Sequence, residues 1–389
     1  MTQTRIAMVT PGSFPVPSPM SSSVERVVEE LAPHLAASGL DVTVHGRKGR
    51  KQPAGESLRG VRYVRHPYRV PGGGLVYPGA VARRVGRDEP HIVQVENRPL
   101  YALRLKRGNP ARRVWLALHS TSFIGPRIGR RTLRHCFEAC DRLVVNSSWL
   151  ADAVTARVPE AAAKLRVVHL GVDTGRFVSR FSEAGAAIRT AFRQQNGWRH
   201  RTIVLFMGRL IPKKGAHHLI RVLPRIADAH PEVLFLIVGS PHYGSHRETV
   251  YSRRLKQTAA PHAAHIRFIP YVPYPEVPNW FLAADMAVVP SGNAEAFGLV
   301  NVEAMAAGLP VIATGAGGIV EIVSEGETGF LLPPHDMEPV LTERLMRLLG
   351  DDGLRERMGR AGRLAVEERF TWRHAAGRWL ALLEENAGE

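Results

Sequence analysis

Strand-length apolar runs recur along the chain, and segments with helical periodicity follow them. RIAMVT (5–10) precedes VERVVEELAPHLAASG (24–39), and TIVLFMG (202–208) precedes GAHHLIRVLPRIADAH (215–230). Mostly apolar strands separated by helices are typical of a parallel sheet that is covered on both faces. The pattern therefore predicts an α/β fold.

The alternation is interrupted over residues 173–200, which are polar and carry no strand signal, although part of this stretch is compatible with a helix. We expect an N-terminal Rossmann-like domain over 1–172, an interdomain linker over 173–200 and a second Rossmann-like domain over 201–369. Residues 370–389 read as an amphipathic C-terminal helix. The length of 389 residues and the 44% hydrophobic content suit two domains. Two such sheets predict two domains facing across a cleft at the carboxyl ends of their strands.

The chain is strongly basic, since Lys and Arg exceed Asp and Glu by 52 − 35 = 17. Such charge is compatible with nucleic acid, an anionic membrane surface or anionic substrates. No zinc finger, basic zipper or aromatic-interleaved RNA motif accompanies it, so we expect no nucleic-acid partner. A solvated Arg-rich surface is the plainer explanation, and a basic face toward anionic lipid or polymer stays open.

The first residues, MTQTRIAMVTPG, lack the pattern of a signal peptide, and no apolar run approaches the roughly 18–20 residues of a membrane span. These features predict a cytoplasmic protein. Cys136 and Cys140 are four residues apart in a predicted helix and lack further ligands at metal-site spacing. We interpret them as small buried hydrophobic residues, and no metal site is expected.

The segment from Glu295 to Val311, EAFGLVNVEAMAAGLPV, carries the strongest chemical signal. A helix predicted to begin near Ala296–Gly298 places free N–H groups beside Glu295, and Glu303 follows two turns later. A helix start binds phosphate, a glycine lets it come close, and carboxylates bind sugar diols. Each glutamate alone would more simply be a helix charge favoured by the dipole.

A second segment, GRLIPKKG (208–215), follows an apolar strand and precedes a helix. Arg209 and Lys214 flank this strand-to-helix turn. Two cations at the carboxyl end of a strand suit a diphosphate, although ordinary surface cations would look the same.

Together these segments resemble the retaining GT-B glycosyltransferases of family 4, the glycosyl transferases group 1. The family's GR-L-x(3)-KG loop is matched by Gly208–Gly215, and its E-x-FG-L-x(3)-E-A-M-A-x-G-x-PV segment by Glu295–Val311. Further similar stretches are VVHLGVDTGRF (167–177), YVPYPEVPNWFLAADMAVVPS (271–291) and GGIVEIVSEGETGFLLPP (317–334). The resemblance implies the GT-B fold, with the helix of 370–389 packing back on the N-terminal domain.

The resemblance also implies roles for individual residues. Glu295 would contact the transferred sugar near its 3- and 4-hydroxyls, Glu303 would hold the nucleotide ribose, and His119 would lie near the 6-hydroxyl and the reacting carbon. A satisfied core histidine is the alternative for His119. The implied donor-binding residues are Gly12, Gly208, Arg209, Lys214, Tyr271, Phe297, Gly298, Leu299 and Glu303. The donor would be a nucleotide diphosphate sugar, with UDP the commonest nucleotide, and neither cofactor nor catalytic metal would be needed.

Part of the sequence departs from the family. Ser21 and Ser22 stand where its first loop usually carries two glycines, in a loop that shapes the acceptor side, and Gly12 is expected to provide the close approach instead. Arg127 and Arg130 suit an anionic acceptor. The loop PGSFPVPSP (11–19), together with SVERVVEELA (23–32), is similar to a bacterial branch of spore-coat-type transferases. This similarity would suggest a spore-forming bacterium, a surface polysaccharide product and association with the spore coat, whereas the basic charge leaves peripheral membrane contact open.

We therefore expect a hexosyltransferase that retains the anomeric configuration and acts on a glycan, lipid or cell- or spore-surface acceptor. The alternative is a nucleotide-sugar-binding coat component with weak catalysis. A sugar 2-epimerase of the same fold would not be expected to show both motifs.

Overall fold

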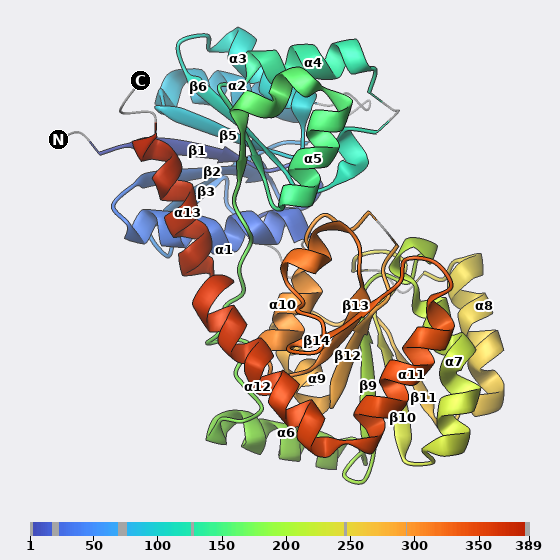
Figure 1. Ribbon diagram of the computed structural model, residues 1–389. Coiled ribbons are helices and arrows are strands. Elements are labelled where there is room, and N and C mark those ends of the chain that lie inside the picture. Colours follow the sequence, from blue (N-terminus) through green and yellow to red (C-terminus); the bar gives the residue numbers. More distant parts are fainter. Residues whose placement is uncertain are drawn as a thin grey trace. The chain divides into compact units, whose positions relative to one another are not determined.

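The computed structural model describes residues 3–17, 23–68, 76–125, 128–244, 247–292 and 294–385 (Figure 1). The chain divides into two compact units. The first is formed by Met1–Leu170 together with Trp372–Glu389, and the second by Gly171–Thr371. Each unit is built on a mainly parallel sheet, which confirms the predicted two-domain α/β fold.

In the described part of the first unit, the strands form one eight-stranded sheet in the order β3-β4-β2-β1-β5-β6-β7-β8. All neighbouring strands are parallel except β3 and β4. The edge strand β3 was not predicted, because its sequence GESL is short and mostly exposed. The elements are β1 (Arg5–Val9), α1 (Ser23–Ala37), β2 (Asp41–Arg47), β3 (Gly55–Leu58), β4 (Val61–His66), α2 (Tyr77–Asp88), β5 (Ile92–Glu96), α3 (Pro99–Gly108), β6 (Arg113–Leu118), α4 (Arg130–Ala139), β7 (Arg142–Val145), α5 (Ser148–Arg157), β8 (Leu165–Val167) and α13 (Trp372–Glu384).

The described second unit holds a six-stranded, fully parallel sheet in the order β11-β10-β9-β12-β13-β14. All residues of β10 are buried, as expected for a strand covered on both faces. The elements are α6 (Glu183–Gln195), β9 (Thr202–Met207), α7 (Ala216–Ala229), β10 (Val233–Val238), α8 (Val250–Ala259), β11 (Ile266–Ile269), α9 (Val277–Ala283), β12 (Met286–Val289), α10 (Leu299–Ala306), β13 (Val311–Thr314), β14 (Gly329–Leu332), α11 (Met337–Gly350) and α12 (Asp352–Arg369).

Residues 173–200, expected as a linker, are an integral part of the second unit. They contain helix α6, whose first turn is capped by the Ser182 hydroxyl accepting from the Gly185 N–H at 3.1 Å. The helix packs on α9. A polar composition marked a surface helix here, because arginines make much of its inward contact, beside Phe192, whose ring packs edge-on against Trp280 of α9 with centroids 5.3 Å apart.

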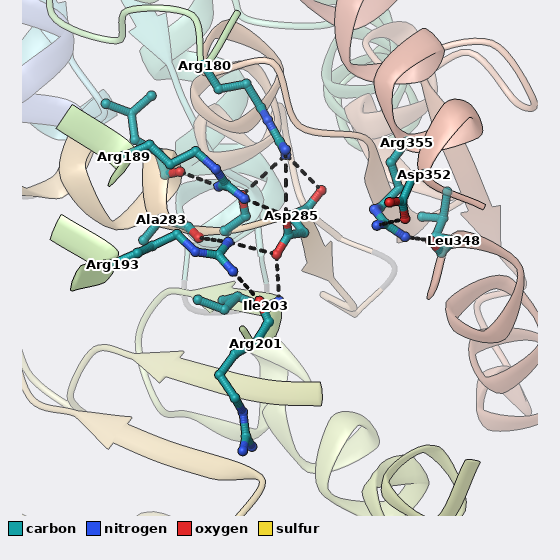
Figure 2. A network of polar contacts seen from close by, with 12 residues as sticks. Arg180, Arg189, Arg193, Arg201, Ile203, Ala283, Asp285, Leu348, Asp352 and Arg355 are labelled. Carbon is teal, nitrogen blue, oxygen red and sulfur yellow. Dashed lines mark hydrogen bonds and ion pairs between the residues drawn. The ribbon is translucent and has the colours of Figure 1, made fainter. Parts of the chain in front are cut away.

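Those arginines surround Asp285, a buried residue just before β12 (Figure 2). From α6, Arg189 lies 2.5 Å and Arg193 3.0 Å from the carboxylate, and Arg180 lies 3.6 Å away. The Ile203 N–H of β9 donates to the same carboxylate at 2.8 Å. Burial acts to raise the pKa of Asp285, but the three guanidinium groups outweigh it and lower the pKa. The cluster anchors α6 to the amino ends of two strands.

Helix α13 follows α12 in the chain but belongs to the first unit, where it packs on α1. Trp379 packs against Trp115 of β6, with the ring planes tilted by 46° and the ring centroids 5.0 Å apart. Its indole N–H donates to Gln94 Oε1 of β5 at 2.5 Å. The last helix is thus tied to the middle of the N-terminal sheet by both apolar and polar contacts. Within the described residues, no helix combines the length and apolar character needed to cross a membrane.

Candidate functional site

The two sequence motifs of the second unit lie on loops that leave adjacent strands. Residues 208–215 follow β9, and residues 290–298 follow β12, its neighbour in the sheet. From β9 the chain proceeds outward through β10 and β11, then returns to β12 and continues outward on the other side (Figure 1). Beyond the carboxyl ends of the strands at such a reversal, open α/β sheets bind their ligands.

The two loops approach each other more closely than side chains would allow. Gly215 has φ +75°, and a Cβ atom there would lie 1.9 Å from the Pro290 carbonyl oxygen. The Gly292 N–H donates to the Lys213 carbonyl at 2.8 Å. The glycine that ends the first motif is therefore required for contact with the second.

Glu295 is fixed by contacts to both neighbouring loops. Its carbonyl accepts from the Gly318 N–H, in the loop after β13, at 2.9 Å. Its carboxylate forms an ion pair with Lys214 Nζ. Burial acts to raise the pKa of Glu295, but the Lys214 ammonium outweighs this effect and lowers the pKa. The structure thus joins a residue of each motif in one ion pair.

Helix α10 begins at Leu299, slightly later than the predicted start near Ala296–Gly298, and Gly298 is its N-cap. Gly298 has φ +92°, and a Cβ atom would lie 2.5 Å from Asn301 Nδ2. The buried Asn301 side chain has no hydrogen-bond partner for either amide atom among the described residues. Phe297 is buried against Phe370, with ring centroids 6.2 Å apart. The packing of Phe297 thus holds the residues just before the helix, and the first N–H groups of α10 lie outside the helix ladder.

Glu303 lies further along α10 and is only 3% exposed. The Tyr274 hydroxyl donates to Glu303 Oε1 at 3.4 Å. A carboxylate buried to this degree is not a solvated helix charge, which excludes the simpler of its two interpretations.

The remaining predicted residues of this unit are spread over the carboxyl edge. The Gly208 N–H donates to the Val238 carbonyl at 3.0 Å, so Gly208 is held against the last residue of β10. The Arg209 guanidinium lies over the Tyr243 ring, 5.3 Å from its centroid. Tyr271 is half-buried in the loop after β11, the edge strand two positions from β9.

In the first unit, His119 follows β6 and is held by Glu96 at the end of the adjacent strand β5. His119 Nε2 lies 2.7 Å from Glu96 Oε2, and the His119 N–H donates to Asn97 Oδ1 at 3.0 Å. The other Glu96 oxygen accepts from Gln94 Nε2 at 2.6 Å. His119 Nδ1 is buried and has no hydrogen-bond partner among the described residues.

The predicted acceptor-side residues are only partly described. Gly12 has φ +73° in the loop after β1, where a Cβ atom would lie 3.0 Å from the Tyr77 ring. Arg130 is exposed at the first position of α4. Ser21, Ser22 and Arg127 lie outside the described residues.

The two cysteines were expected to be small buried residues, and in the structure Cys136 and Cys140 are buried free thiols. Burial raises the pKa of the Cys140 thiol to about 12, which keeps it protonated. The described residues contain no group of three or more His, Cys, Asp or Glu side chains that could hold a metal ion.

Four polar residues of these sites were not predicted. Asn301 and Tyr274 lie inside or beside recognised segments, but nothing in their spacing distinguishes them from neighbouring residues. Gln94 and Glu96 did carry a signal: in HIVQVE they occupy alternate positions, and therefore one face, of an otherwise apolar strand.

Comparisons with known proteins match both units. The family model described as glycosyl transferases group 1 matches residues 188–365, and glycosyltransferase family 4 matches residues 24–176. Spore coat protein SA of Bacillus subtilis is 30% identical over 382 residues, which cover 98% of this chain and 100% of the relative.

Solved structures share the fold. Sucrose-phosphate synthase from Thermosynechococcus elongatus superposes with a TM-score of 0.81 at 22% identity, covering 99% of this chain and 100% of that one. Anabaena Alr3699/HepE in complex with UDP-glucose superposes with a TM-score of 0.76 at 20% identity, covering 98% of this chain and 99% of that one. With the two motifs joined at the sheet edge, and with a relative matched over its whole length, the chain belongs to the glycosyl transferases group 1, the family 4 glycosyltransferases of GT-B fold.

Proposed function

We propose that this glycosyltransferase uses a nucleotide diphosphate sugar, with UDP as the nucleotide, bound at the carboxyl edge of the second unit's sheet. The ion pair between Lys214 and Glu295 carries this proposal, because it brings a cation and a sugar-binding carboxylate together where two motif loops meet. The structurally similar Anabaena protein was crystallised with UDP-glucose, which supports the choice of donor.

The diphosphate would be bound by Arg209, Lys214 and the first turn of α10. Guanidinium and ammonium groups offset the phosphate charge, and the N–H groups next to Gly298 donate to phosphate oxygens. Two resident cations make a catalytic metal unnecessary in this proposal. Lys214 is already oriented by Glu295, so less side-chain entropy is lost on binding.

The sugar and ribose would be held by carboxylates. The buried Glu303 would accept hydrogen bonds from the ribose hydroxyls, and Glu295 would accept them from the sugar's 3- and 4-hydroxyls. His119 would contact the 6-hydroxyl, as the family resemblance implies. Transfer would proceed on one face of the sugar with retention of configuration, and the leaving phosphate would help to deprotonate the acceptor.

The acceptor would be a glycan, a lipid or another component of a cell or spore surface. The name of the relative, spore coat protein SA, supports this choice and also supports a second candidate function. In that candidate the protein binds the nucleotide sugar as part of a coat but turns it over weakly.

Donor hydrolysis and thermal stability test the proposal. Wild type should be stabilised by UDP and should release UDP from at least one UDP-sugar, with the sugar product formed in its original anomeric configuration. Glu295→Gln should retain UDP binding but hydrolyse the donor about a hundredfold more slowly. Glu232→Gln is the matched control, since Glu232 precedes β10 at the opposite edge of the same sheet.

Two results would contradict parts of the proposal. Absence of stabilisation by every nucleotide tested would exclude the donor site. Stabilisation by UDP without any turnover, in wild type and variants alike, would favour the structural coat component.

A further inference from the structure

A groove of about 560 Å³ runs along the edge of the first unit's sheet, between strands β3 and β4 and helix α2. Arginines dominate its lining, and Glu56 is the one carboxylate that lines it among the described residues. The lining arginines are Arg62, Arg65, Arg83, Arg84 and Arg87. Those of α2 follow the three- and four-residue spacing that places side chains on one face of a helix.

Some of these arginines have structural partners. Arg65 is buried and forms an ion pair with Glu56. Arg84 pairs with Asp88, one turn along α2, at 2.8 Å. Arg62 donates to Thr43 Oγ1 at 2.8 Å, which orients its guanidinium without neutralising it.

Arg83 and Arg87 differ from the others. Both are exposed, and neither takes part in an ion pair within the described portion of the chain. With Arg62 they leave three uncompensated positive charges around one concavity. Like charges that line one groove repel one another, and a bound anion would relieve the repulsion.

His66 also lines the groove but adds no charge at neutral pH. Burial lowers the pKa of His66 to about 4, and the neighbouring Arg84 contributes to the shift. The positive potential therefore comes from guanidinium groups, which stay charged at any physiological pH and match phosphate oxygens with paired N–H donors. The volume exceeds that needed for a single phosphate and lies in the range of small-molecule sites.

The groove is remote from His119. In the sheet, β2, β1 and β5 lie between β4, which lines the groove, and β6, which leads to His119. Four inter-strand steps of about 4.8 Å correspond to roughly 19 Å. No residue assigned to donor or acceptor binding lines the groove.

We propose that this groove is a separate binding site for a phosphate-bearing ligand with at least two anionic groups. Arg83 and Arg87 supply the unpaired cations, and Arg62 completes the cradle from the strand side. The phosphates belong either to lipid headgroups at a membrane surface or to a free phosphorylated glycan, which present the same chemistry to the arginines.

Binding of two probes tests the site in the full-length protein. Inorganic tripolyphosphate is titrated calorimetrically in the presence of saturating UDP, and vesicles of phosphatidylcholine with phosphatidylglycerol are tested by co-sedimentation. Arg83→Ala with Arg87→Ala is compared with Arg253→Ala with Arg254→Ala, which removes the same charge from exposed positions of α8 in the other unit. Thermal melting verifies that both variants are folded.

The groove variant should bind at least one probe about tenfold more weakly than wild type, and the α8 variant within about twofold of it. Loss confined to vesicles assigns the phosphate to a membrane, and loss confined to tripolyphosphate assigns it to a free ligand. Absence of wild-type binding in both arms, or equal binding by the two variants, would overturn the proposal. UDP titration of the same proteins reports separately on the donor site.

Discussion

His119 Nε2 lies 2.7 Å from Glu96 Oε2, and this contact fixes which nitrogen of the imidazole carries the proton. A carboxylate only accepts hydrogen bonds, so Nε2 donates and Nδ1 of a neutral ring is left as an acceptor. The second Glu96 oxygen accepts from Gln94, whose own oxygen accepts from Trp379 of the C-terminal helix. A chain of buried hydrogen bonds thus runs from α13 to the candidate catalytic histidine.

The first prediction reverses this tautomer. In Glu96→Gln the new amide keeps nearly the same shape, and its oxygen can still accept from Gln94. Its NH₂ group then faces His119 Nε2, which must become the acceptor, so Nδ1 gains the proton. We expect kcat to fall about tenfold or more with little change in the KM for donor. The ¹⁵N resonances of His119 should show the exchanged tautomer.

Glu89→Gln is the control for this variant, since Glu89 is an exposed glutamate of the same unit that pairs with Arg112. It should leave kcat and the His119 resonances unchanged. Unaltered resonances in Glu96→Gln would show that Glu96 does not position the ring.

The second prediction concerns the ion pair of Lys214 with Glu295. Lys214 keeps the pKa of Glu295 low despite burial, so the pair stabilises the fold above the unfolded pKa of about 4.3. This stabilisation is lost as pH falls through the lower folded pKa. Lys214→Ala should therefore melt below wild type at pH 7, and the gap should narrow below about pH 4. Lys213→Ala removes a neighbouring exposed lysine and should show a smaller, flatter difference.

Gly215 is the subject of the third prediction. Gly215→Ala incurs both a positive φ and a collision with the Pro290 carbonyl, so we expect a loss of about 2–4 kcal/mol in the free energy of unfolding. Gly197→Ala is a matched control, because Gly197 has φ +71° with no atom within 4 Å of an added Cβ. Gly197→Ala should lower the free energy of unfolding by only about 1–2 kcal/mol. Equal losses would mean that the motif loops can separate without cost.

Local pattern predicted most of the fold, and the exceptions share a physical cause. The strands buried on both faces are continuous apolar runs that stand out in the sequence, as in VLFLIV of β10. Strand β3 and helix α6 did not stand out. The first is an exposed edge strand, and the second is held by arginines that meet Asp285 about 90 residues later. Polar contacts between residues far apart in the chain produce no hydrophobic periodicity that could be recognised in the sequence.

The candidate site shows the same division. The glycines and charges of the two motif loops were recognisable because each motif is contiguous. The hydrogen-bond chain that links His119 to Gln94 and Trp379 could not be recognised in the sequence, because 285 residues separate Gln94 from Trp379. The groove arginines were read as ordinary surface charge, because only the packing of α2 beside β4 brings them together.

The fourth prediction tests Asp285 as the anchor of α6. Asp285→Asn leaves one buried and two half-buried guanidinium groups facing a neutral side chain, and we expect a loss of about 3–5 kcal/mol in the stability of the second unit. The arginines lower the pKa of Asp285, so the wild-type advantage should persist down to about pH 3.9 and shrink at lower pH. Asp228→Asn, at an exposed position of α7, should change stability little in chemical denaturation.

The last prediction separates a ribose-binding role of Glu303 from a structural one. If Glu303 holds the ribose, wild type should prefer UDP to 2′-deoxy-UDP, because the deoxy compound lacks one of the hydroxyls that the carboxylate accepts from. Glu303→Gln should bind UDP about tenfold more weakly and lose most of that preference, as expected for a weakened charge-assisted hydrogen bond. Glu276→Gln, an exposed residue two positions from Tyr274, should keep both the affinity and the preference in calorimetric titrations. An equal loss of affinity for both nucleotides in Glu303→Gln would instead assign the buried carboxylate, with the Tyr274 hydroxyl 3.4 Å away, to the packing of α10.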